Sequence, residues 1–354
     1  MVVCNSCRYC EGLCAVFPAM ETRRIFSDKD LNYLANLCHG CGACYDDCQF
    51  SPPHEFNVNV PRTLAIVRND AYRAYAWPRA LGRLFARNGL AVTVIAALSV
   101  AAFILCCVML LDPTTFGGRH TGPGAFYALV PHEGMVLLFG SMFTAAVAAI
   151  VVGAREFAHE GGTLSRASLW RASKDAGNLR YLGGGKGGCR SEEQRGADTR
   201  RGFHHLTLYG FLLCFAATCT ATVYHYALGR EAPYPWYDVP VLLGMLGGLG
   251  LLVGPVGLLF ARFRRPAHYR DESRGGMDVA FLAILFLASL SGLALLMLRA
   301  TALMGLVLAV HLGLVFAFFV TLPYGKFVHG IYRYLALARY AQERTALSSF
   351  VEKG

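Results

Sequence analysis

The sequence predicts an all-α membrane protein, in which a six-helix transmembrane bundle follows a small, mainly helical, cysteine-rich N-terminal module. Of the 354 residues, 55% are hydrophobic and only 16% are charged, whereas a soluble domain is nearer a quarter charged. Six apolar stretches each approach the roughly 20 residues that a bilayer core requires. The alternation of polar and apolar residues that marks β-strands is scarce.

Eight cysteines define the N-terminal module, residues 1–60. They form two runs of one spacing, Cys4-x2-Cys7-x2-Cys10-x3-Cys14 and Cys38-x2-Cys41-x2-Cys44-x3-Cys48. This is the spacing of two-cluster ferredoxins, in which the fourth cysteine of each run binds the other cluster. We therefore expect two [4Fe–4S] clusters in a ferredoxin-like module, one held by Cys4, Cys7, Cys10 and Cys48 and the other by Cys38, Cys41, Cys44 and Cys14.

Two other uses of these cysteines are weaker. Structural zinc also favours C-x2-C pairs, but it has no use for the four-cysteine run given twice. A disulfide framework suits a secreted protein, and no secretory signal precedes the first apolar run at Gly89. Between the runs, residues 19–37 are expected to form one helix whose core contacts are Met20, Ile25, Leu31, Leu34 and Leu37.

Residues 61–88 are basic and aromatic. We expect them to form an amphipathic link on the membrane surface, with anionic lipid headgroups as partners. The bundle then occupies 89–330, with a loop at 155–203 and a tail at 331–354. The expected spans are 89–111, 134–154, 206–229, 239–261, 279–298 and 300–325.

The positive charges of the chain indicate its orientation. The net charge of +10 is concentrated in loops, with ten Lys or Arg in 155–203 and five in 262–274, whereas the three opposite loops hold one each. By the positive-inside rule, both termini, the long loop and the cysteine module face the cytoplasm of a multi-pass inner-membrane protein. Topology accounts for the charge, so no nucleic-acid partner is expected.

Histidines in or beside the spans are candidate haem ligands, because an ionisable group within a membrane is costly and usually functional. His311 and His329 are 18 residues, or five helical turns, apart, although Pro323 lies between them. Antiparallel spans place His204 with His329 at the cytoplasmic face, and His225 with His311 in the outer half. Two bis-histidine haems of the b type follow as a hypothesis, with His205 and His132 as reserve ligands.

Simpler roles for these histidines stay open. Those at the interface are often only solvated, and a histidine in a span also serves as a proton relay or a packing residue. The segment Gly183-Gly184-Gly185-Lys186-Gly187-Gly188-Cys189 lacks the strand and helix of a phosphate-binding motif. We expect it to be a flexible cytoplasmic loop that touches the cluster module or a partner.

Over nearly its whole length the chain resembles the B proteins of tricarballylate and citrate utilisation. The resemblance rests on residues 4–14, Asp30 to Asp47, residues 52–56, Leu179 to Cys189, and Arg200-Arg201-Gly202-Phe203-His204-His205. It implies that the protein accepts electrons from an FAD-dependent dehydrogenase, the A protein of the system, and passes them to the membrane quinone pool. The spacing of His311 and His329 is also similar to that of the dihaem subunits of nitrate reductase and heterodisulfide reductase.

The expected function is therefore that of an electron-transfer subunit of an oxidoreductase. Its electrons would pass from the flavoprotein through two [4Fe–4S] clusters and two haems to quinone. The alternative is a permease or sensor with a regulatory iron–sulfur module. The spans show no inverted repeat and no pair of broken helices, as many transporters do.

Overall fold

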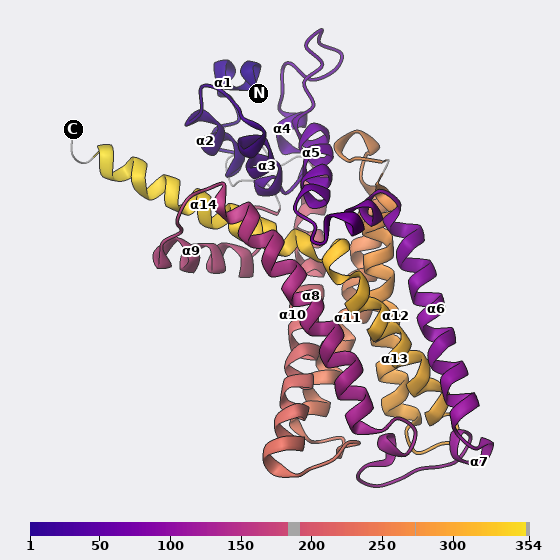
Figure 1. The fold of residues 1–354 in the computed structure, drawn as a ribbon. Coiled ribbons are helices and arrows are strands. Elements are labelled where there is room, and N and C mark those ends of the chain that lie inside the picture. Colours follow the sequence, from indigo (N-terminus) through magenta and orange to yellow (C-terminus); the bar gives the residue numbers. More distant parts are fainter. Residues whose placement is uncertain (183–191, 273, 352–354) are drawn as a thin grey trace.

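The computed structural model describes residues 1–182, 192–272 and 274–351, and these residues form helices and no β-strand (Figure 1). Six of the helical segments are long and apolar enough to cross a membrane. The predicted fold class, an all-α membrane protein with six spans, is confirmed. The six segments are Arg79–Leu110, His132–His159, Thr199–Leu228, Val239–Arg264, Gly275–Leu298 and Met304–Ala346.

The N-terminal module consists of short helices. The one helix expected over residues 19–37 is wrong, because the chain forms α2 and α3 with a break between them. Ser27 causes the break: its side chain and that of Asp30 form a capping box that begins α3. Ile25 lies in the break and is 86% exposed, whereas Met20, Leu34 and Leu37 are buried. The helices of this part are α1 (Val2–Cys7), α2 (Val16–Glu21), α3 (Asp28–Leu37), α4 (Ala43–Asp46), α5 (Val60–Ala74) and η1 (Arg79–Arg87).

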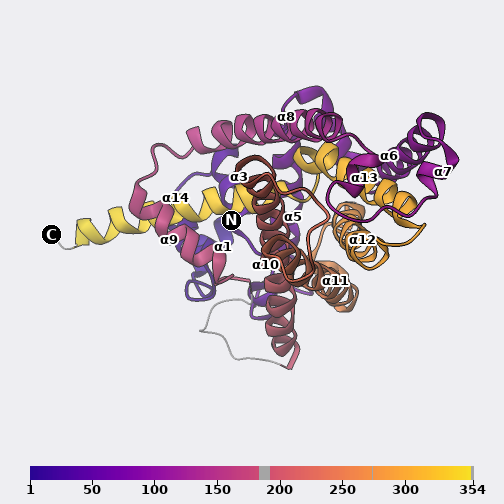
Figure 2. The same ribbon diagram turned by 90° about the horizontal axis from the view of Figure 1, so that it is seen from below.

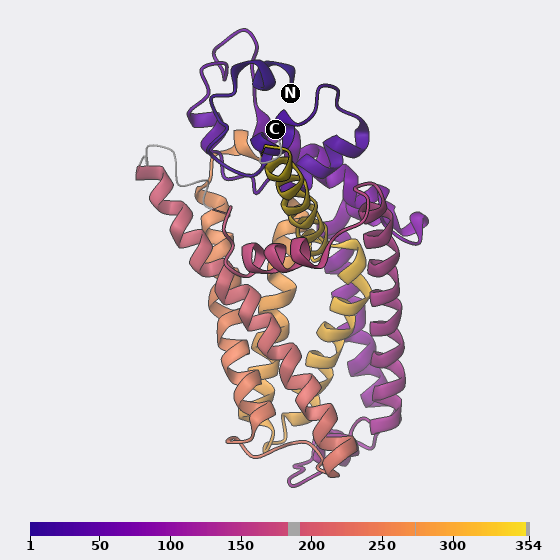
Figure 3. The same cartoon turned by 90° about the vertical axis from the view of Figure 1, so that its left-hand side faces the viewer.

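The bundle helices pack in an arc. α10 packs along α11, α11 on α12, α12 on α13 and α6, and α13 on α8 (Figure 2). The N-terminal module lies over one end of the long bundle helices, called here the module end of the bundle (Figure 1, Figure 3). The elements are α6 (Asn88–Leu110), α7 (Pro113–Phe116), η2 (Ala125–Ala128), α8 (His132–His159), α9 (Arg166–Gly177), α10 (Glu192–Leu228), α11 (Val239–Arg264), η3 (Ala267–Tyr269), α12 (Gly275–Leu298), α13 (Met304–Thr321), η4 (Leu322–Tyr324) and α14 (Val328–Val351).

The sixth span does not continue as one regular helix to His329. α13 ends at Thr321, η4 contains Pro323, and a new helix begins at Val328. Proline cannot donate the backbone hydrogen bond that would continue the helix. α14 then leaves the bundle at an angle and runs beneath the N-terminal module (Figure 1).

The N-terminal module shares one apolar core with α5 and α14. Tyr33 and Leu37 of α3 are buried together with Tyr72 of α5 and with Tyr332 and Leu337 of α14. The basic residues Arg73, Arg79 and Arg83 of the link remain exposed. The link is therefore amphipathic, and its contact with lipid stays a prediction.

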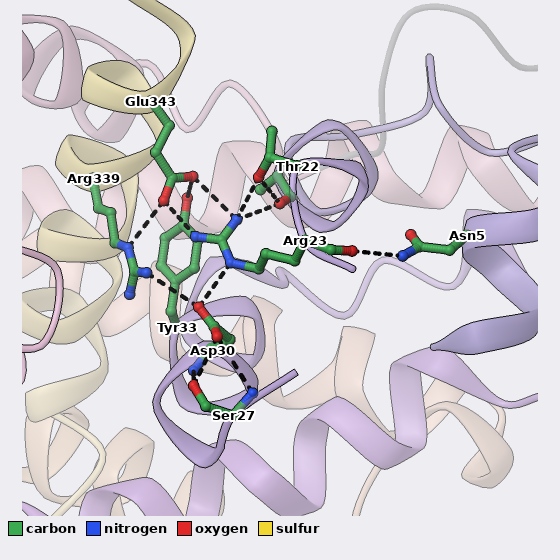
Figure 4. Close-up of polar contacts among 9 residues, drawn as sticks. Asn5, Thr22, Arg23, Ser27, Asp30, Tyr33, Arg339 and Glu343 are labelled. Atoms are coloured by element: carbon green, nitrogen blue, oxygen red, sulfur yellow. Dashed lines mark hydrogen bonds and ion pairs between the residues drawn. The ribbon is translucent and has the colours of Figure 1, made fainter. Parts of the chain in front are cut away.

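An ionic network fastens α3 to α14 (Figure 4). Arg23 contacts Asp30 at 2.8 Å and also Glu343, and Arg339 contacts Asp30 at 3.2 Å and Glu343 at 3.1 Å. The hydroxyl of Tyr33 donates to Glu343 at 3.1 Å. Burial raises the pKa of Asp30, but hydrogen bonds from Arg23 and Ser27 outweigh it and hold that pKa below its ordinary value. Asp30 is therefore ionised at neutral pH.

The substitution Asp30→Asn should weaken the attachment of the module to α14. It removes a charge that two arginines share, so we expect a loss of about 1–3 kcal/mol in the free energy of unfolding. Asp28→Asn is the matched control, since Asp28 lies in the same first helical turn but is exposed. Limited proteolysis of the module in detergent measures both, and equal cleavage rates in the two variants would contradict the role given to this network.

Glycines allow α10 and α11 to approach closely. A Cβ atom on Gly247 would lie 2.7 Å from the carbonyl oxygen of Gly210, and one on Gly250 would lie 2.9 Å from that of Leu206. These distances are shorter than any normal contact, so the two backbones touch through small residues, as membrane helices often do. Gly244 lies one turn away and would place its Cβ at an ordinary 3.8 Å from Ala217.

The pair Gly247→Ala and Gly244→Ala tests this contact. Both changes add one methyl group to the same helix, so any gain in helix propensity cancels between them. Only Gly247→Ala forces the backbones apart, and it should lower the free energy of unfolding by about 1–3 kcal/mol. Thermal unfolding in detergent provides the measurement, and similar midpoints for the two variants would rule out the close contact.

Candidate functional site

Each set of four cysteines predicted to act together lines one pocket. Cys4, Cys7, Cys10 and Cys48 line one pocket and are called here the outer set. Cys14, Cys38, Cys41 and Cys44 line the second pocket, which is close to the bundle, and are called the bundle-side set. The structure therefore groups the fourth cysteine of each run with the three leading cysteines of the other run. That is the arrangement on which a crossed ligation depends.

Glycine shapes the loop that carries the bundle-side cysteines. Gly40 and Gly42 have φ values of 56° and 96°, a left-handed conformation that favours residues without Cβ. A Cβ on Gly42 would also lie 3.1 Å from the ring of Tyr269. The turn aims backbone donors at sulfur, because the N–H of Gly40 donates to Sγ of Cys38 at 3.3 Å.

The cysteines lie in surroundings that disfavour a bare thiolate. Burial raises the pKa of Cys10 to about 12, and the neighbouring Cys48 and Cys4 add to the rise. Burial also raises the pKa of Cys14, and Cys41 and Cys38 act in the same direction. Clustered buried thiolates need compensating positive charge, and iron ions provide it. The donor sets therefore fit iron–sulfur clusters.

The side-chain geometry does not favour a site for a single metal ion. Within residues 1–182, 192–272 and 274–351, no three His, Cys, Asp or Glu side chains are placed so as to hold one ion. Tetrahedral zinc requires four donors about 2 Å from one point. The thiolates of a cubane bind different irons and need not converge in this way.

His204 and His329 meet at the module end of the bundle. Their ring centres are 6.2 Å apart, and the ring planes are inclined by 67°. A metal–imidazole bond is about 2 Å long, so two rings on opposite sides of one iron have centres roughly 6 Å apart. Nδ1 of His329 is in hydrogen-bond contact with the carbonyl of Lys326, which leaves Nε2 available for a metal. Nδ1 of His204 is buried and has no partner among the described residues.

At the opposite end of the bundle, His225 lies against His132. The two rings stack with centres 3.7 Å apart and planes inclined by 19°. Tyr127 packs on both rings, at 5.0 Å and 5.8 Å. Nδ1 of His225 is buried and finds no partner in the part of the chain that the structure describes. His132, a reserve ligand in the sequence prediction, is thus the histidine beside His225.

The other two candidate histidines have contacts of their own. Nδ1 of His311 lies 3.0 Å from Oγ of Ser291 and 3.1 Å from the carbonyl oxygen of Ala288, both on α12. These contacts hold Nδ1 of His311 to α12 and leave its Nε2 without a contact to either residue, as Nε2 of His329 is left. The ring beside His225 is that of His132, and not that of His311. His205 packs on Tyr209 of its own helix at 5.9 Å. The predicted pair His204–His329 is brought together, and the predicted pair His225–His311 is not.

Phenylalanine rings occupy the bundle between the two histidine pairs. Phe143 of α8 contacts Phe215 of α10 at 6.1 Å and Phe319 of α13 at 5.5 Å. Phe211 of α10 contacts Phe318 of α13 at 5.9 Å. These rings join α8, α10 and α13 across the open side of the arc and make its interior apolar. The Gly-rich segment 183–189, with Cys189, lies outside the described residues.

Comparison with known proteins covers almost the whole chain. Residues 1–74 match the model of the citrate utilization protein B Fer4-like domain, and residues 83–349 match that of citrate utilization protein B. Citrate utilization protein B of Escherichia coli is 47% identical to this chain, over 97% of this chain and 91% of the relative. The search of solved structures finds no match. The chain belongs to the citrate utilization protein B family.

Proposed function

We propose that this protein carries electrons from an FAD-dependent dehydrogenase of tricarballylate or a citrate-related acid to the quinone of the inner membrane. The family and its Fer4-like domain support an iron–sulfur electron-transfer role in citrate utilization. The observation that carries the finer proposal is that α14 connects the two sites: Arg333, one helical turn after His329, donates to the carbonyl oxygen of Cys38. Cysteine and histidine sites that follow one another from the N-terminal module into the bundle suit stepwise electron transfer.

The two cysteine sets, the histidines and the phenylalanines have different roles in this proposal, according to their positions in the fold. The outer cysteine set lies beside Tyr9, which is 71% exposed, and the helix that carries Cys4 and Cys7 also exposes Val2 at 76%, so a soluble flavoprotein has access there. The bundle-side set leads toward His204 and His329, and the phenylalanines keep water from the interior. Flavin and quinone each exchange two electrons, and [4Fe–4S] clusters and haems, when bound, supply the one-electron chemistry that lets them react without meeting.

The proposal includes two b-type haems, one bound by His204 and His329 and the other by His225 and His132. His204 and His329 have the ring separation that one iron requires. His225 has His132 as its neighbour, but the two rings stack face to face. Imidazole binds a metal through a nitrogen in the ring plane, so both rings would have to turn as well as separate for one iron to bind between them. Because the structure places His132, and not His311, beside His225, His132 is the proposed second ligand of the haem at the end of the bundle opposite the module. The charge distribution of the loops supports a cytoplasmic location for both termini and the cysteine module.

The crossed arrangement of cysteines predicts the result of Cys14→Ser. Although Cys14 belongs to the first run, its loss should abolish the electron paramagnetic resonance signal that Cys41→Ser abolishes. The signal that Cys7→Ser abolishes should remain. Cys106→Ser, an exposed cysteine of α6, is the control and should leave both signals and the iron content unchanged. Loss of the Cys7-dependent signal alone would show that each run binds its own cluster.

Haem content distinguishes the two possible partners of His225. His132→Ala should remove about half of the haem per protein, and His311→Ala should leave nearly all of it, because the ring beside His225 is that of His132. The pyridine haemochrome assay of purified protein measures both. Full haem in His132→Ala together with half in His311→Ala would restore the pairing His225–His311. An absorption spectrum of the native protein without reducible haem bands would refute both assignments.

A further inference from the structure

Three arginines from three separate elements hold the loop of the bundle-side cysteines. Arg68 of α5 and Arg333 of α14 both donate to the carbonyl oxygen of Cys38, at 2.7 Å and 3.0 Å. Arg265, which follows α11, donates to the carbonyl oxygen of Gly40. All three side chains are half-buried. In the described part of the chain, none of the three forms an ion pair with a carboxylate.

The outer cysteine set has different electrostatic surroundings. It has charges of both signs: Asp47 directly precedes Cys48, and the N-terminal ammonium acts on Cys4. Around the bundle-side set, the side chains that contact the cysteine loop are the arginines Arg68, Arg265 and Arg333. The bundle-side set therefore has the more positive surroundings.

This difference bears on reduction. A cluster bound by four thiolates is an anion, and an added electron makes it more negative. Burial disfavours that added charge, while nearby cations and hydrogen bonds to sulfur favour it, so both influence the reduction potential. The bundle-side set includes the buried Cys38. Burial alone would make its cluster the harder one to reduce.

The position of Arg333 connects the cysteine loop with the histidines. Arg333 follows His329 by four residues on α14, about one helical turn. One side of α14 thus presents a candidate haem ligand and a cation that contacts the cysteine loop.

We propose that Arg68, Arg265 and Arg333 raise the reduction potential of the cluster held by Cys14, Cys38, Cys41 and Cys44, so that it accepts electrons from the outer cluster despite its burial. This inference rests on the proposed function, because it assumes that both clusters are present. In this role the three arginines act on the reduction potential of the cluster through their positive charge.

The experiment is a redox titration of the purified full-length protein, followed by electron paramagnetic resonance. Arg333→Gln removes the charge but keeps an amide donor for the carbonyl of Cys38. It should lower the potential of the signal that depends on Cys41 and leave that of the Cys7-dependent signal unchanged. Arg333→Lys keeps the charge and should retain most of the native potential. Arg62→Gln is the control for a lost surface charge on α5, since Arg62 is exposed.

A second variant tests whether the reduction potential of the outer cluster changes independently of that of the bundle-side cluster. The amide of Gln49 lies 3.6 Å from Sγ of Cys7, so Gln49→Leu should shift only the Cys7-dependent potential. If Arg333→Gln loses a cluster, Arg265→Gln and Arg265→Lys provide the same comparison from another element. Unchanged potentials in Arg333→Gln with full iron content would overturn the inference, as would an equal decrease in the Gln and Lys variants. A native protein without either cluster signal would instead overturn the proposed function.

Discussion

The packing of α14 against the N-terminal module is the contact on which the arrangement of cysteines and histidines depends. Tyr332 of α14 is buried in the core that the module and α5 share. His329 and Arg333, one turn apart on the same helix, then reach His204 and the carbonyl of Cys38. Residues of a helix are about 100° apart around its axis. A rotation of α14 by one residue would therefore remove the core contact, the histidine contact and the arginine contact together.

Local patterns in the sequence were sufficient for much of the fold. The six spans follow from hydropathy, because a bilayer imposes length and apolar composition on each helix separately. The cysteine spacing determined which four cysteines would meet, since each run confines three thiolates to one tight loop. The break between α2 and α3 was missed, although Ser27 and Asp30 have the residue types and spacing of a helix cap.

The histidine partners could not be derived in the same way. The argument from five helical turns between His311 and His329 required one regular helix, and the chain instead breaks between Thr321 and Val328. Helical phase also does not say which neighbouring helix a side chain faces. His311 faces α12 because of how α12 and α13 pack, a property of two helices. The arginines were missed for a related reason: Arg68, Arg265 and Arg333 are far apart in sequence and resemble ordinary positive loop charges.

The position of the second histidine pair has an electrical consequence. His204 and His225 are separated along α10 by about 32 Å at 1.5 Å per residue, close to the thickness of a bilayer core. If the module faces the negative cytoplasmic side, as proposed, an electron that passed to His225 and His132 would cross most of the membrane in the direction that the potential favours. That movement releases about 2.3 kcal/mol per electron for each 100 mV. Quinone reduction at the module end would involve no such movement, so the position of the quinone site would determine whether the proposed electron transfer acts on the membrane potential.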